Sequence, residues 1–61
     1  MIVRTYSYWY IGINSFVVYY GSHEHPAMIN ETFDEYWQAE KFAEYLDNRG
    51  FPYVELSALE G

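Results

Sequence analysis

The sequence contains no cysteine and only three lysine or arginine residues. Without thiols, the chain can form neither a disulfide nor a thiolate metal site, so its small core can gain external support only from a partner chain. No apolar run reaches the length of a transmembrane helix. Residues 1–11 are not a secretory leader, because Arg4, Thr5 and Ser7 interrupt the apolar run. We therefore expect a protein of the cytoplasm that does not enter a membrane.

The residues that are abundant are aromatic and acidic. Eight Tyr, four Phe and two Trp occur in 61 residues, with nine Asp or Glu and a formal net charge of −6. Aromatic side chains supply a large contact area at a small cost in entropy, and a negative surface repels nucleic acid and attracts basic partners. The length allows a single domain, residues 1–61. Composition thus indicates a small acidic binding protein and leaves its target open.

Two β-type segments begin the chain. Residues 1–10 and 16–20 are rich in Val, Ile, Tyr and Trp, and turn residues lie between them. Their closeness predicts an antiparallel hairpin in which Trp9 faces Val18 and Tyr8 faces Tyr19. This register sorts the side chains onto two faces. The face expected to be buried holds Val3, Thr5, Ser7, Trp9, Ile11, Phe16, Val18 and Tyr20. The other face holds Arg4, Tyr6, Tyr8, Tyr10, Val17 and Tyr19.

A helix follows a loop over residues 23–30. Thr32 and Glu35 have the spacing of a capping box, which predicts a helix that begins there and continues to Leu46 or Asp47. Gly50 can adopt the left-handed conformation that often ends a helix. Residues 51–56 then form a third strand, and residues 57–61 a frayed tail.

The helical pattern predicts how these elements pack. One stripe of the helix is apolar or small and should lie on the sheet, with Val54 and Leu56 in the core. That stripe consists of Tyr36, Ala39, Phe42, Ala43 and Leu46. We therefore expect an α+β fold in the order β-β-α-β, with the helix on one sheet face. The uncovered face would display Tyr6, Tyr8, Tyr10, Tyr19 and Tyr53.

This tyrosine face is the first candidate site. Tyr6, Tyr8 and Tyr19 can be ordinary half-exposed strand residues, because a tyrosine hydroxyl stays hydrated. They can instead form an interface for self-association or for another protein. Stacking of single-stranded bases is disfavoured, because such platforms need a cationic groove and this face offers only Arg4.

The exterior of the helix is the second candidate site. Glu40, Glu44 and Asp47 follow i, i+4, i+7 spacing, and Asp34 lies just before them. These carboxylates can form an ordinary solvated face or an extended acidic ridge that docks on a groove made for phosphates.

Beside the carboxylates, Trp37, Lys41 and Tyr45 form a stripe that points away from the predicted core. Trp37 can be simply exposed, covered by the loop over residues 23–30, or an interface anchor. We favour the anchor, because Lys41 and Tyr45 extend the same stripe.

The sequence contains few residues in the arrangements that enzymes and metal sites use. His23 and His25 could offer two metal ligands, but zinc sites need three or four, and the chain has no further His or Cys. No nucleophile and base occur in a recognisable context, and no Gly-rich phosphate loop is present. We expect no enzyme, no cofactor and no metal.

In overall character the chain resembles the small acidic proteins that phages and mobile elements encode against host machinery, anti-CRISPR proteins among them. No motif defines that group, so no residue role transfers from it. The resemblance implies a non-enzymatic inhibitor in the host cytoplasm. Its partner would be a basic nucleic-acid-binding surface of a host protein or nucleoprotein complex, without direct contact to nucleic acid. The alternative is a homo-oligomeric structural or regulatory module, such as a homodimer, that associates through the tyrosine face.

Overall fold

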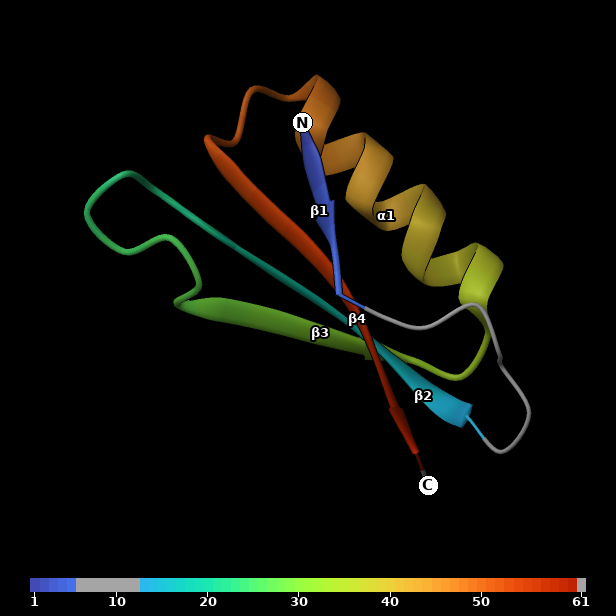
Figure 1. Cartoon of the computed structure of the whole chain (residues 1–61). Coiled ribbons are helices and arrows are strands. Elements are labelled where there is room, and N and C mark those ends of the chain that lie inside the picture. The colour runs from blue at the N-terminus through green and yellow to red at the C-terminus, as the bar shows by residue number, and fades with distance from the viewer. Residues whose placement is uncertain (6–12, 61) are drawn as a thin grey trace.

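A computed structural model describes residues 1–5 and 13–60 of the chain. The elements are β1 (Ile2–Arg4), β2 (Ile13–Gly21), β3 (Ile29–Phe33), α1 (Tyr36–Asn48) and β4 (Tyr53–Glu60). In this part of the chain the strands form one mixed sheet in the order β1-β4-β2-β3, and α1 covers one of its faces (Figure 1). The predicted α+β class is therefore confirmed. At 13 residues, α1 is neither long nor apolar enough to cross a bilayer.

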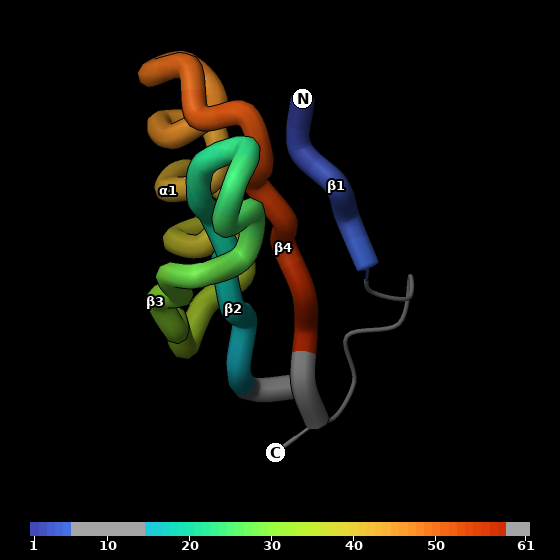
Figure 2. The backbone as a smooth tube through the Cα atoms, turned by 90° about the vertical axis from the view of Figure 1, so that its left-hand side faces the viewer, coloured from blue at the N-terminus to red at the C-terminus, as the bar shows by residue number. Residues whose placement is uncertain are grey.

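The strand pairing differs from the predicted hairpin. β4 lies between β1, to which it is parallel, and β2, to which it is antiparallel (Figure 2). β2 pairs on its other side with β3, so Val18 lies opposite both Glu31 and Leu56. The predicted partners on residues 8–11 lie outside the described residues, but both flanks of β2 are already occupied, so that register is wrong. β4 pairs with β2 from Ile13 to Gly21, so it occupies the flank of β2 that the predicted hairpin gave to the first residues of the chain.

The loop before β3 is shorter than predicted, because Ile29 and Asn30 already belong to β3. Its start is a tight turn. The backbone N–H of Ser22 donates to the carbonyl oxygen of His25 at 3.1 Å, and the N–H of His25 donates to the Ser22 hydroxyl at 3.2 Å. A Cβ on Gly21 would lie 1.9 Å from that His25 oxygen, so the turn requires glycine there.

The predicted capping box at the start of the helix is wrong. Thr32 lies in β3 opposite Val17, and α1 begins at Tyr36. Its N-cap residue is Glu35, which has an extended backbone and makes no side-chain cap hydrogen bond. Strand pairing with β2 has therefore overridden a local helix-start signal at Thr32.

The end of the helix agrees with the prediction. Gly50 has a φ of 91°. Its N–H donates to the carbonyl oxygen of Asp47 at 3.1 Å, and the N–H of Phe51 donates to that of Leu46 at 3.3 Å. This pair of bonds is a Schellman motif, which satisfies carbonyls that the helix leaves open. Pro52 follows directly.

β4 extends past the predicted third strand. Residues 57–60 continue it, with Ser57 opposite Val17 and Ala58 opposite Phe16. The predicted frayed tail is therefore wrong up to residue 60, because these residues still have backbone partners on β2.

The core forms between α1 and the sheet as predicted for the helix. Ala39, Ala43 and Leu46 are buried against the sheet, and the two alanines allow close approach. Aromatic rings surround this contact in the edge-to-face pairs Phe16–Tyr36, Tyr20–Phe42 and Tyr20–Phe51, and all of these rings except that of the buried Phe16 are partly buried. The largest fully buried side chains are Val18, Val54 and Leu56.

Within β1 the predicted faces are reversed. Ile2 packs against the core, and Val3 is 41% exposed. The cause is the parallel register, which places Ile2 beside Val54 and Arg4 beside Leu56 on the helix side of the sheet.

Candidate protein-binding surface

The stripe predicted to point outward from the helix is exposed. Trp37 is 58% and Tyr45 is 53% exposed, and Lys41 between them is also open to solvent. The loop before β3 does not cover Trp37, because it lies by the C-terminal end of α1, where His25 and Arg49 line the same pocket. The possibility that this loop buries Trp37 is therefore excluded.

The tyrosine in this stripe is held by two neighbours. Its ring stacks on Phe42 with a centroid distance of 6.3 Å, which links Tyr45 to the partly buried rings of the core. The Arg49 guanidinium lies 5.5 Å from the ring centroid, and its Nη1 donates to the Tyr45 hydroxyl at 3.3 Å. Sequence reasoning missed Arg49 as part of the surface. The signal was present, because residues 37, 41, 45 and 49 are spaced by four.

The predicted carboxylate ridge is divided by the fold. Glu44 and Asp34 are exposed and form no ion pair within the described part of the chain. Glu40 and Asp47 instead bind cationic groups from the first residues of the chain, Arg4 and the amino group of Met1. The ridge is thus less negative than its sequence suggests, and Glu44 and Asp34 are its carboxylates without an ion pair in the described part of the chain.

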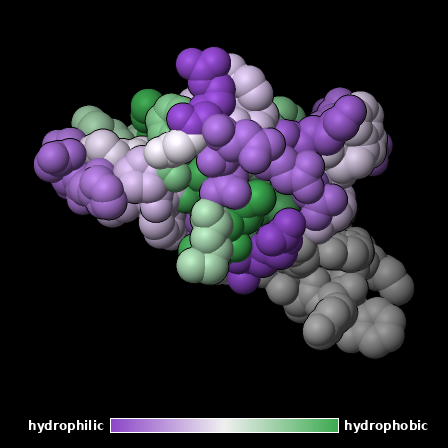
Figure 3. Space-filling view, turned by 90° about the horizontal axis from the view of Figure 1, so that it is seen from above, coloured by the Kyte–Doolittle hydropathy of each residue, from purple (hydrophilic) through white to green (hydrophobic). Residues whose placement is uncertain are grey.

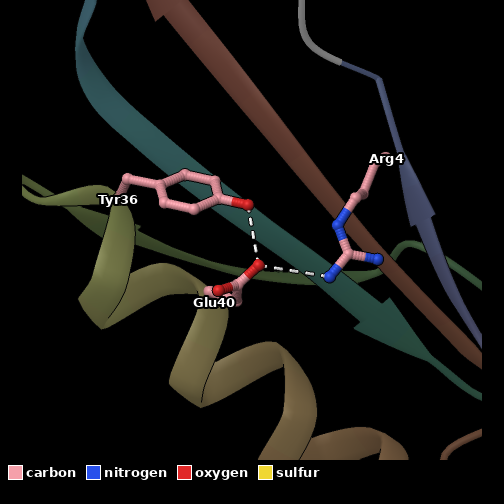
Figure 4. A network of polar contacts seen from close by, with 3 residues as sticks. All are labelled: Arg4, Tyr36 and Glu40. Carbon is pink, nitrogen blue, oxygen red and sulfur yellow. Dashed lines mark hydrogen bonds and ion pairs between the residues drawn. The ribbon is translucent and has the colours of Figure 1, made fainter. Parts of the chain in front are cut away.

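Glu40 has the best-defined environment of these groups. Its Oε2 accepts a hydrogen bond of 2.7 Å from the Tyr36 hydroxyl and one of 3.3 Å from Nη2 of Arg4, as Figure 4 shows. The Tyr36 bond lowers the pKa of Glu40 below its usual range, partial burial acts in the opposite direction, and Arg4 lowers it further. Glu40 therefore joins α1 to β1 as an ionised group.

The tyrosine face lies on the side of the sheet away from α1. Tyr6 and Tyr8 lie outside the described residues. Tyr19 is half-buried there, and Val17 on the same face is only 4% exposed. Among the described residues of this face, Tyr19 therefore matches the half-exposed strand residue that was one of the two alternatives, and the interface stays a prediction.

Tyr53 and Glu55 also lie on this face. The Tyr53 hydroxyl donates to Glu55, which accepts a second bond of 3.3 Å from the Thr5 hydroxyl. The bond to Glu55 raises the pKa of Tyr53, and partial burial and the Glu55 charge act in the same direction. Thr5 and Glu55 thus add a side-chain link between β4 and the end of β1.

A pocket of about 450 Å³ lies where α1 ends. His25, Met28, Arg49 and Phe51 are among the residues that line it, and the described lining contains no carboxylate. Figure 3 shows this end of the molecule, with hydrophobic atoms between hydrophilic ones. Within residues 1–5 and 13–60, no three His, Asp or Glu side chains are grouped to hold a metal ion. The described lining of the pocket therefore offers no carboxylate that could act with His25 as an acid–base pair or complete a metal site.

Comparison with known proteins gives no match to a protein-family model, to a curated protein or to a solved structure.

Proposed function

We propose that this protein is a non-enzymatic inhibitor that binds a basic surface of another protein through the outer face of α1. The observation that carries the proposal is the exposure of Trp37 and Tyr45 on one stripe of that face, at 58% and 53%. Exposed Trp and Tyr side chains are frequent anchors of protein interfaces. Eight residues along a helix separate the backbone positions of Trp37 and Tyr45 by about 12 Å along the axis, which allows their rings to enter two different pockets of a partner.

The charge of the protein supports a basic partner. The net charge is −6, and Glu44 lies on the same outer side of α1 without an ion pair in the described part of the chain. Surfaces that bind nucleic acid present Lys and Arg to phosphates, and carboxylates can take the place of those phosphates. Charge would mainly speed the encounter, and the aromatic anchors would supply affinity. The partner is thus a nucleic-acid-binding surface in the host cytoplasm, as in the anti-CRISPR proteins.

Self-association through the tyrosine face is the alternative. The described part of that face offers less open area than α1 does, because Tyr19 and Tyr53 are half-buried and Val17 is buried. The helix surface is therefore the stronger candidate.

The test measures how a panel of purified RNA-guided nuclease complexes binds target DNA, with and without the protein. We expect at least one complex to lose DNA binding. Trp37→Ala should weaken this inhibition by roughly 2 kcal/mol, about thirtyfold. Glu44→Gln should slow association most at low salt, because salt screens exposed charges. Glu24→Gln removes the same charge from an exposed residue of the loop before β3 and is the matched control.

Two results would contradict the proposal. If every complex in the panel binds DNA equally well with and without the protein, the proposal that the protein inhibits RNA-guided nucleases is wrong. If inhibition survives both Trp37→Ala and Glu44→Gln, the outer face of α1 is not the surface. A dimer in light scattering that persists in Trp37→Ala would favour the tyrosine face.

A further inference from the structure

The outer edge of β3 has no strand beside it within the described part of the chain. β3 ends the strand order β1-β4-β2-β3, and Figure 1 shows it at the margin of the sheet. Its inner edge pairs with β2 from Ile29 to Phe33. The first four of its five residues are exposed. An open strand edge presents unpaired backbone N–H and C=O groups, which another extended chain can pair with.

The middle of this edge and the end that leads to α1 are acidic, whereas Arg49 lies at the other end, where it lines a pocket with Met28 and Ile29. No Lys or Arg occurs between Thr5 and Glu40, whereas Glu24, Glu31 and Asp34 lie in that stretch and are all exposed. Glu31 occupies the middle of β3, opposite Val18 on the inner neighbour. A strand added to the edge would therefore place one of its side chains directly beside the Glu31 carboxylate.

We propose that the outer edge of β3 binds an extended basic segment of a partner protein, which adds to the sheet as a further strand with Lys or Arg opposite Glu31. Backbone hydrogen bonds would supply much of the affinity, and the alternate side chains would set specificity. An apolar residue near one end of the segment would contact Met28 and Ile29, which are 71% and 48% exposed. This inference does not depend on the proposed role of α1.

A second copy of the chain fits this edge poorly. An antiparallel pairing that overlaps all five residues of β3 puts Glu31 directly opposite Glu31 of the other copy. Like charges directly opposite one another destabilise a strand pair. Each copy also carries a net charge of −6, which opposes association. The occupant is therefore a basic segment of a different protein.

The experiment uses the full chain and a short, fluorescently labelled peptide of alternating lysine and valine, with binding followed by anisotropy. Two further peptides carry N-methyl groups, one on every lysine and one on every valine. In a strand, every second residue donates its backbone N–H group to the neighbouring strand on one side. The N–H groups of the residues between them point to the other side. We expect one methylated peptide to lose binding by about tenfold or more and the other to keep it.

Charge variants locate the site on the protein. Glu31→Lys should weaken binding of the unmethylated peptide at least about fivefold. Asn48→Lys adds a positive charge at an exposed residue near the end of α1 and should leave the affinity within about twofold. Circular dichroism checks that both variants are folded. Amide hydrogen exchange adds an independent measurement, because pairing should slow exchange in β3.

The proposal is wrong if both methylated peptides bind like the parent, since attraction would then be ionic and without strand pairing. It is also wrong if Glu31→Lys and Asn48→Lys weaken binding equally, or if exchange in β3 is unchanged at saturating peptide. These outcomes leave the role of α1 untouched, because the nuclease test depends on Trp37 and Glu44. Loss of nuclease inhibition in Trp37→Ala would likewise leave peptide binding at β3 intact.

Discussion

The hydroxyl of Tyr36 donates a hydrogen bond of 2.7 Å to Oε2 of Glu40, one helical turn further along α1. The same oxygen accepts a bond from Arg4, so one carboxylate links the helix to β1. The pKa of Glu40 is lowered in the folded state, mainly by Tyr36. The ionised form therefore stabilises the fold at pH values above the usual Glu range. This contribution is lost as the pH falls through that range to the lower folded pKa.

Tyr36→Phe should raise the pKa of Glu40 towards its usual value, because it removes the hydroxyl and keeps the ring that packs on Phe16. The measurement is the chemical shift of the Glu40 carboxyl carbon as a function of pH. The difference in stability between parent and variant should shrink as the pH falls below the usual Glu range. Tyr45→Phe removes a hydroxyl from the same helix without touching Glu40 and is the control. An unchanged Glu40 titration in Tyr36→Phe would contradict this account.

Gly21→Ala and Gly50→Ala should destabilise the protein to different extents. Gly50 has a φ of 91° and open space where a Cβ would lie, so Gly50→Ala should cost only backbone strain, about 1–2 kcal/mol. At Gly21 a Cβ would lie 1.9 Å from the carbonyl oxygen of His25, and the backbone itself must move. Gly21→Ala should therefore destabilise more than Gly50→Ala in urea unfolding. Equal losses would contradict the requirement for glycine at Gly21, because the turn would then accept a Cβ at no greater cost than the position of Gly50 does.

The sequence predicted the helix better than the sheet, and the reason is the range of the interactions. The buried stripe of α1 and its end at Gly50 depend on residues within a few turns of one another, so periodicity and one glycine are enough. Strand partners depend on contacts between distant segments. The pairing of Ile2 with Val54 has no local signal, and neither has the choice of β3 and β4 as the neighbours of Val18.

The same distinction holds for the surface. The exposed stripe of Trp37, Lys41 and Tyr45 followed from helical spacing alone. Arg49 continues that spacing and could have been included. The ion pair between Arg4 and Glu40 joins residues 36 apart in sequence, so only the fold brings them together. That pair is why the carboxylate ridge is weaker than the sequence suggested.

Improving the helix start should stabilise the protein. Glu35 is the N-cap of α1 but makes no side-chain cap hydrogen bond. Asp is a much better N-cap residue, because its shorter side chain reaches the backbone N–H groups of the first turn. Glu35→Asp keeps the charge and should add about 0.5–1 kcal/mol to the free energy of unfolding, measured in urea.

Thr32→Val is the companion measurement for the helix start. If Thr32 capped the helix, its loss would cost about 1 kcal/mol. Because Thr32 is an exposed residue of β3, and Val is at least as favourable in a strand, we expect no loss of stability. A loss near 1 kcal/mol would support the capping box against the observed strand.

Trp37→Ala should leave stability almost unchanged. The side chain is 58% exposed, and substitutions on such surfaces usually stay within about 0.5 kcal/mol. Leu46→Ala, on the buried face of the same helix, should cost about 2–5 kcal/mol, because Leu46 is 3% exposed and its removal leaves a cavity.

In a Trp9→Phe background, acrylamide should quench the fluorescence of Trp37 strongly in the free protein. Quenching should fall in a complex with any nuclease that the protein inhibits, because an anchor enters the partner. If Trp37→Ala costs about 3 kcal/mol or more, Trp37 supports the fold. If quenching is undiminished in the complex, the outer stripe of α1 does not contact the partner.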